Sequence, residues 1–92
     1  MWVVVAYDIP DDTRRARLHR RLKGLLEPVQ KSVFEGEVAA GGLARLRKIV
    51  EHRIDLEEDD VRIYVLCGGC RGSTLLLGVA RPARDRREPL VV

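Results

Sequence analysis

The chain has 92 residues, of which 46% are hydrophobic and 34% charged, and its 17 basic and 14 acidic residues give a net charge of +3. A chain of this length holds one hydrophobic core, which excludes two independent domains, and its composition is that of a soluble globular protein. It lacks both an apolar run of the roughly 20 residues that span a membrane and the positive start of a signal peptide. We therefore expect a cytoplasmic protein with no membrane partner.

The first third of the chain predicts a strand and then a helix. Residues 2–8 form a short apolar, β-branched run that ends on Asp8, which is typical of a buried strand. Residues 10–13 supply a turn and helix N-caps, and leucines then recur at helical spacing. We expect this helix to cover residues 13–26.

The middle of the chain predicts a second strand and a second helix. Val33 and Phe34 favour a strand within residues 29–38, and apolar residues repeat at helical spacing over residues 43–54. An acidic loop at residues 55–60 follows. Alternation over residues 61–65 then predicts a third strand that ends near residue 67.

The C-terminal third predicts a glycine-rich turn at residues 68–73, a fourth strand at residues 75–80 and a charged tail at residues 81–92. The resulting order, β-α-β-α-β-β, predicts an α+β fold: a ferredoxin-like αβ sandwich over residues 1–80, with one antiparallel-rich sheet and two helices on one face. The other sheet face needs cover. We expect a homodimer in which this face meets a second copy and the apolar C-terminus, residues 90–92, adds a strand to the partner's sheet.

Asp8 is the first candidate for chemistry, because a carboxylate at the end of a buried strand emerges where such folds commonly place ligands. The alternative is a simple turn contact with the backbone. If Asp8 binds a metal, a hard cation such as Mg²⁺ fits, since it accepts one or two carboxylates and takes further ligands from water and phosphate. Two copies of Asp8 near a dimer axis would complete such a site.

The segment from residue 13 to residue 31 carries seven basic residues against one acidic residue. Arg14, Arg17 and Arg21 fall at helical spacing and predict one basic ridge, with Arg15 on the adjacent face. An ordinary solvated helix face is the alternative. The local excess of one sign favours binding of a nucleic-acid backbone.

Cys67 and Cys70 form one Cys-x-x-Cys pair, a pattern shared by half zinc sites and redox pairs. A structural zinc ion takes four ligands, and His19 and His52 are not at ligand spacing from the pair. A redox pair opens a helix, whereas this pair lies in a predicted turn. The pattern favours a turn without a chemical role, and both histidines are expected to be ordinary surface or interface residues.

Three segments carry a resemblance to a known family. They are residues 3–9 (Val-Val-Val-Ala-Tyr-Asp-Ile), residues 29–37, which contain Gln-Lys-Ser-Val-Phe-Glu-Gly, and residues 61–67. At this spacing the chain resembles, over about residues 1–80, the second CRISPR-associated adaptation protein family (Cas-two). The Tyr-Asp strand end and the Gln-x-Ser-Val-Phe-x-Gly stretch are the most specific parts.

The resemblance implies a ferredoxin-like homodimer in which Asp8 binds a catalytic Mg²⁺ and the C-terminal strand packs on the other protomer. Members are described as metal-dependent endonucleases acting on single-stranded RNA or double-stranded DNA, and as the bridging partner of the integrase that inserts spacers into a CRISPR array. The implied partners are therefore nucleic acid and CRISPR integrase subunits. A non-catalytic scaffold that bridges the integrase and a small toxin-type ribonuclease of the same fold stay open as alternatives.

The resemblance also implies roles for individual residues. The family's basic residues after the strand-end Asp map onto Arg15 and Arg17, and Tyr7 lies at a motif position. Some members carry a basic residue just before the Gln of the second segment, where this chain has Pro28 and Val29, and Lys31 is the candidate replacement. The predicted nucleic-acid-binding residues are Tyr7, Arg14, Arg15, Arg17, Arg21, Lys31, Ser32 and Phe34.

Overall fold

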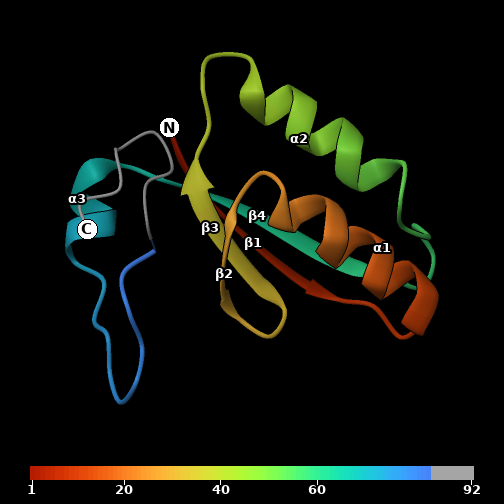
Figure 1. Ribbon diagram of the computed structural model, residues 1–92. Helices are drawn as coiled ribbons and strands as arrows, with labels where there is room; N and C mark the ends of the chain where they lie inside the picture. Colours follow the sequence, from red (N-terminus) through yellow and green to blue (C-terminus); the bar gives the residue numbers. More distant parts are fainter. Residues whose placement is uncertain (84–92) are drawn as a thin grey trace.

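The computed structural model describes residues 1–83 and contains one sheet covered by helices on one face (Figure 1). In chain order the elements are β1 (Trp2–Asp8), α1 (Asp12–Lys23), β2 (Glu27–Gln30), β3 (Val33–Glu37), α2 (Gly42–Glu51), β4 (Asp60–Leu66) and α3 (Gly68–Gly72). The four strands are antiparallel neighbours in the order β2-β3-β1-β4. This β-α-β-β-α-β order confirms the predicted α+β, ferredoxin-like class and the predicted placement of both long helices on one face.

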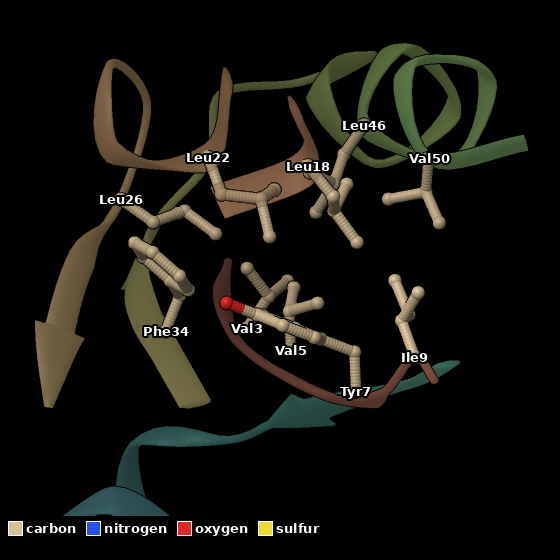
Figure 2. Packing of buried hydrophobic residues seen from close by; sticks show 10 residues of the cluster. All are labelled: Val3, Val5, Tyr7, Ile9, Leu18, Leu22, Leu26, Phe34, Leu46 and Val50. Carbon is tan, nitrogen blue, oxygen red and sulfur yellow. The ribbon is translucent and has the colours of Figure 1, made fainter. Parts of the chain in front are cut away.

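The core lies between the sheet and the two long helices (Figure 2). Val3, Val5 and Tyr7 alternate along β1 and face the helices, because side chains two apart in a strand share one face. Leu18 and Leu22 of α1 meet them. The remaining buried members of this core are Ile9, Leu26, Phe34, Leu46 and Val50.

The single strand predicted within residues 29–38 is wrong, because the structure has a hairpin there. β2 and β3 pair antiparallel around a turn at Lys31 and Ser32. β2 is one of the two edge strands of the described sheet, and its register shifts between Pro28 and Gln30. Pro28 lacks the N–H that a central strand needs, so it is accommodated at this edge. The predicted element order β-α-β-α-β-β is corrected accordingly.

The strand predicted at residues 75–80 is also wrong. Residues 74–83 form neither helix nor strand, and Leu75 and Leu77 are 85% and 81% exposed. The preceding segment, predicted as a turn, contains the short helix α3. The predicted C-terminal strand at residues 90–92, and its pairing with a partner, lie outside the described residues.

The sheet face opposite the long helices is covered at one end and open elsewhere. Trp2 is buried at the covered end, where the Arg71 guanidinium lies 3.4 Å above its ring and its indole N–H donates to Glu35 at 3.1 Å. Further along this face Tyr64, opposite Val4 in the register, is 48% exposed. The described part of the chain therefore leaves apolar and aromatic surface uncovered on this face.

Candidate functional site

Basic side chains gather in a hollow beside α1, at the end of β1 and the β2–β3 turn. We call this hollow the α1 groove. Its α1 residues recur at spacings of three and four, which places them on one face of the helix. The peptide N–H of Tyr7 donates to the Ser32 carbonyl at 3.0 Å, which holds the turn against β1. The groove is lined by Tyr7, Asp12, Arg15, Ala16, His19, Arg20, Lys23, Lys31 and Ser32.

The α1 groove has an excess of positive charge, since four of its residues are basic and one is acidic. The Arg15 guanidinium donates to the Asp12 carboxylate and to the Ile9 carbonyl, the latter at 3.0 Å. These contacts hold Arg15 at the end of β1. The turn contributes Lys31 and the half-buried Ser32 from the opposite side. Cationic and hydroxyl groups facing one hollow are suited to phosphate oxygens.

An aromatic cluster forms the floor of the groove. The Tyr7 hydroxyl lies 3.0 Å from Nδ1 of His19. The Phe34 ring is stacked on Tyr7 with 6.3 Å between the ring centroids, and it meets His19 edge-on with 5.1 Å between the centroids. Burial raises the pKa of the Tyr7 phenol, an effect that the nearby Arg15 charge opposes. Tyr7 is therefore a neutral hydrogen-bonding group at neutral pH.

Phe34 requires a correction to its predicted role. Its side chain is fully buried, so it cannot contact nucleic acid directly. It supports Tyr7 and His19 from below. His19 itself was missed, although its spacing of four from both Arg15 and Lys23 places all three on one helix face.

Asp8 is exposed at the end of β1, and its backbone register pairs it with Asp60 of β4. Directly opposed residues point to the same sheet face with Cβ atoms about 4.5–5.5 Å apart. The two carboxylates therefore share the open face, on the side opposite Tyr7. In the sequence Asp60 ends an acidic run that predicts a loop, and the structure instead begins β4 at this residue.

The Asp8 and Asp60 pair fits the donor set of Mg²⁺, a hard cation that takes one or two carboxylates and completes its shell with water and phosphate oxygens. The Asp8 side chain makes no hydrogen bond or ion pair within residues 1–83. In the same residues no three His, Cys, Asp or Glu side chains gather as a metal-binding group.

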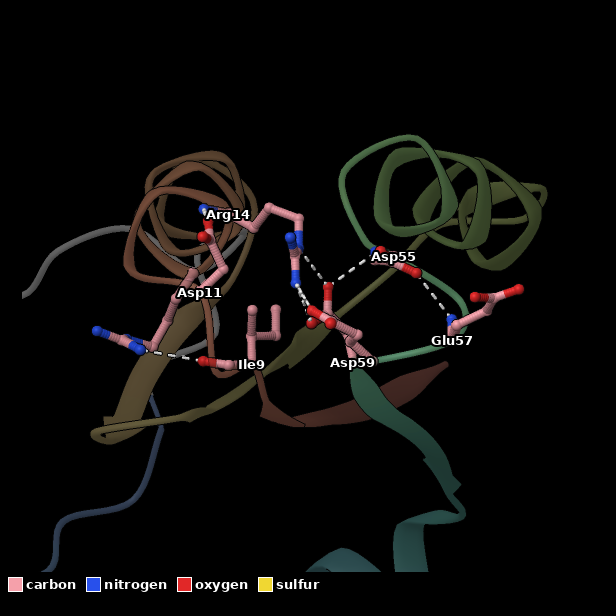
Figure 3. A network of polar contacts seen from close by, with 8 residues as sticks. Ile9, Asp11, Arg14, Asp55, Glu57 and Asp59 are labelled. Atoms are coloured by element: carbon pink, nitrogen blue, oxygen red, sulfur yellow. Dashed lines mark hydrogen bonds and ion pairs between the residues drawn. The ribbon is translucent and has the colours of Figure 1, made fainter.

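The predicted ridge of Arg14, Arg17 and Arg21 does not line the α1 groove. Arg14 donates from Nε and Nη2 to the two Asp59 oxygens at 2.9 Å each, and from Nη2 to Glu58 at 3.1 Å (Figure 3). Hydrogen bonding to Asp59 is the main cause that raises the pKa of Arg14, and the same bond lowers the pKa of Asp59. Arg14 thus joins α1 to the loop before β4.

Arg17 and Arg21 have different surroundings. Arg17 lines a separate hollow between the helices, together with Lys48, Ile49, His52 and Arg53 of α2 and the residues after it. Arg21 is half-buried. The structure therefore brings Tyr7, Arg15, Lys31 and Ser32 together, adds His19, Arg20 and Lys23, and separates Arg14 and Arg17 from them.

The described helices are all too short or too polar to cross a lipid bilayer. Fold and site together define a small ferredoxin-like protein with a basic groove at one end of its sheet. Comparison with known proteins gives the family: the model for CRISPR-associated protein Cas2 matches residues 1–74, and the chain belongs to that family. The resemblance in the sequence is confirmed.

Individual relatives agree with this assignment. A Thermus thermophilus protein named CRISPR-associated endonuclease Cas2 2 is 48% identical over 88 residues, covering 96% of this chain and 92% of that protein. A protein from a second Thermus thermophilus strain, named CRISPR-associated endoribonuclease Cas2, is 41% identical over 78 residues, covering 85% and 83%. The crystal structure of a hypothetical Thermus thermophilus protein matches with a TM-score of 0.78 at 41% identity, covering 90% of this chain and 96% of that one.

Proposed function

We propose that this chain is a cytoplasmic endonuclease of CRISPR adaptation that binds RNA or DNA through the α1 groove and hydrolyses a phosphodiester bond. The observation that carries the proposal is the convergence of Arg15, Arg20, Lys23 and Lys31 on one hollow with Tyr7, His19 and Ser32. The names of the relatives, endonuclease and endoribonuclease, support the activity.

The groove binds the backbone of the nucleic acid. Arginine and lysine side chains replace counterions at the phosphates, which makes the affinity dependent on salt. The Ser32 and Tyr7 hydroxyls add neutral hydrogen bonds. Phosphate contacts set position and carry no sequence information, so we expect binding without base preference.

Cleavage requires a metal ion, and Asp8 is the residue that would hold Mg²⁺, with Asp60 as the second carboxylate. When bound, the ion supplies an activated water molecule and neutralises charge on the phosphate. Asp8 follows Tyr7 directly in β1, so the binding groove and the carboxylates lie at the same end of one strand. Arg15 and Lys31 would hold the nucleic-acid backbone near that strand end from the groove side.

A homodimer completes the site. The open sheet face bears the half-exposed Tyr64 and the partly exposed Val4, which a second copy would cover. If the two-fold axis of this stacking passes near the end of β1, the two Asp8 side chains face one another across it. The CRISPR integrase subunits are the further partners that we propose for the dimer.

A non-catalytic scaffold is the second candidate. One observation favours it: Asp8 points to the sheet face opposite Tyr7, so the carboxylates do not line the groove that would bind the nucleic acid. In that case the dimer positions DNA for the integrase and cuts nothing.

The test is cleavage and binding of end-labelled single-stranded RNA and duplex DNA by wild type and Asp8→Asn, with Mg²⁺ or EDTA. Glu57→Gln, which removes an exposed carboxylate elsewhere, is the matched control. Mg²⁺-dependent cutting that is lost in Asp8→Asn, while binding persists and Glu57→Gln cuts normally, is the expected result. If wild type, Asp8→Asn and Glu57→Gln all bind with equal strength and none of them cuts, the nuclease hypothesis is overturned and the scaffold hypothesis is left.

A further inference from the structure

The Cys-x-x-Cys pair begins a helix, contrary to the predicted turn. Cys67 is the N-cap of α3, and the peptide N–H of Cys70 donates to the Cys67 sulfur at 3.3 Å. The two sulfur atoms lie 3.4 Å apart, and both residues are free thiols exposed to solvent. Because redox pairs open helices, the observed helix favours the redox interpretation that the predicted turn had disfavoured.

The pair is held in place by its surroundings. Arg71, the residue after Cys70, lies over the Trp2 ring, which anchors α3 to the sheet. The Ser73 hydroxyl donates to the Gly69 carbonyl at 2.9 Å and closes the helix. Since Trp2 pairs with Leu66 at one end of β1 and Asp8 with Asp60 at the other, the thiols and the carboxylates lie at opposite ends of the sheet.

We propose that Cys67 and Cys70 form a thiol–disulfide exchange site whose substrates are small-molecule disulfides. Cys67 is the attacking thiol and Cys70 the resolving thiol. The Cys67 thiolate attacks one sulfur of the disulfide, forms a mixed disulfide and releases one small thiolate. The Cys70 thiolate then attacks the Cys67 sulfur, closes the Cys67–Cys70 disulfide and releases the second small thiolate. Each released thiolate takes up one of the two protons given by the cysteines, so the two cysteines are oxidised and one disulfide is reduced to two thiols.

The order of attack follows from the hydrogen bonds. The Cys67 sulfur accepts the Cys70 N–H, which stabilises the charged form and lowers the pKa of Cys67. The side-chain contact with Cys67 raises the pKa of Cys70. Thiolate is the reactive form, and exposure lets a small disulfide reach it. The proposal does not depend on nucleic-acid binding.

The experiment mixes the reduced full-length chain with oxidised glutathione and follows intact mass and released thiol over time, for wild type, Cys67→Ser and Cys70→Ser. Wild type is expected to lose two hydrogens, keep no glutathione and release both glutathione thiols. Cys70→Ser is expected to keep one glutathione. Cys67→Ser is expected to form its adduct about tenfold more slowly. Circular dichroism confirms that each variant is folded.

Three results would overturn the proposal: a glutathione adduct that persists on wild type, disulfide-linked pairs of chains in place of an internal bond, or equal adduct rates in the two single variants. Repeating the reaction in denaturant is the internal control. There the rate difference between the two variants should vanish, because it depends on the folded hydrogen bond. A difference that persists in the unfolded chains counts against the structural origin of the site.

Discussion

The Tyr7 hydroxyl lies 3.0 Å from Nδ1 of His19 and joins β1 to α1 at the floor of the α1 groove. Phe34 packs against both rings. Its complete burial fixes the positions of two side chains that face the groove. A fully buried residue thereby helps to set the geometry of the groove surface.

Tyr7→Phe removes this hydrogen bond, and we expect a loss of about 0.5–1.5 kcal/mol in the free energy of unfolding at neutral pH. The substitution should also change how stability depends on pH above about pH 10. The folded state raises the pKa of Tyr7 above its ordinary value of 10.0, so wild-type stability falls as pH rises from 10 through the folded pKa. Tyr7→Phe should lose this decline, measured as Tm against pH. Tyr64→Phe, at an exposed site, is the control and should keep it; an unchanged decline in Tyr7→Phe contradicts the assignment.

The ion pair of Arg14 with Asp59 should contribute to the loss of stability at acidic pH. The Asp59 pKa is lowered in the folded state, so its contribution is present above its ordinary value of 3.8 and is lost as pH falls through the folded pKa. We expect Asp59→Asn to unfold at lower temperature at pH 7 and to lose less stability on acidification than wild type. The measurement is Tm from neutral pH to below about pH 3. Glu58→Gln is the control, since Glu58 is the more exposed carboxylate partner of Arg14. This variant should change Tm little. An equal change in Tm for both variants would contradict the assignment of the acid-side loss to Asp59.

Gly36 lies where β3 passes beneath Leu26. A Cβ at this position would lie 2.7 Å from Leu26 Cδ2, and Leu26 is itself 1% exposed with no room to move away. Gly36→Ala should therefore lower the free energy of unfolding by about 1–3 kcal/mol in urea titration. Gly24→Ala is the matched control, since Gly24 has helical φ and ψ of −75° and −13° and its Cβ meets nothing closer than 3.5 Å. Gly24→Ala should leave the free energy of unfolding unchanged or raise it by up to about 1 kcal/mol. Similar losses of stability in Gly36→Ala and Gly24→Ala would contradict the packing argument.

The α1 groove predicts a specific salt dependence. Replacing Arg20 and Lys31 together by Gln should weaken binding of a labelled single-stranded RNA. It should also reduce the slope of log affinity against log salt by about 0.7 for each phosphate interaction removed. Fluorescence anisotropy at several salt concentrations measures both quantities. Arg17→Gln is the control, because it removes one positive charge from α1 outside the groove. A loss of affinity in Arg17→Gln as large as that of the groove variant would place the binding surface along the Arg14, Arg17 and Arg21 ridge instead.

The sequence predicted the elements whose signal is local. The alternation of residues 61–65 and the helical spacing of apolar residues in α1 and α2 follow from periodic burial of one face, which each segment expresses by itself. The placement of Asp8 at a strand end was readable for the same reason. The apolar run at residues 75–80 was misleading, because a run of leucines predicts burial and the described chain provides nothing to bury it.

The pairings between distant segments were decided by the tertiary structure. Lys31 meets His19 at one groove because the β2–β3 turn is held against β1 by the Tyr7 N–H, and Asp60 meets Asp8 because β4 pairs with β1. The Cys67 hydrogen bond that opens α3 likewise depends on a backbone conformation that spacing alone left ambiguous. Local periodicity thus determined which residues form helices and strands. Strand order and register, which arise from contacts between residues far apart in the chain, determined which side chains share a site.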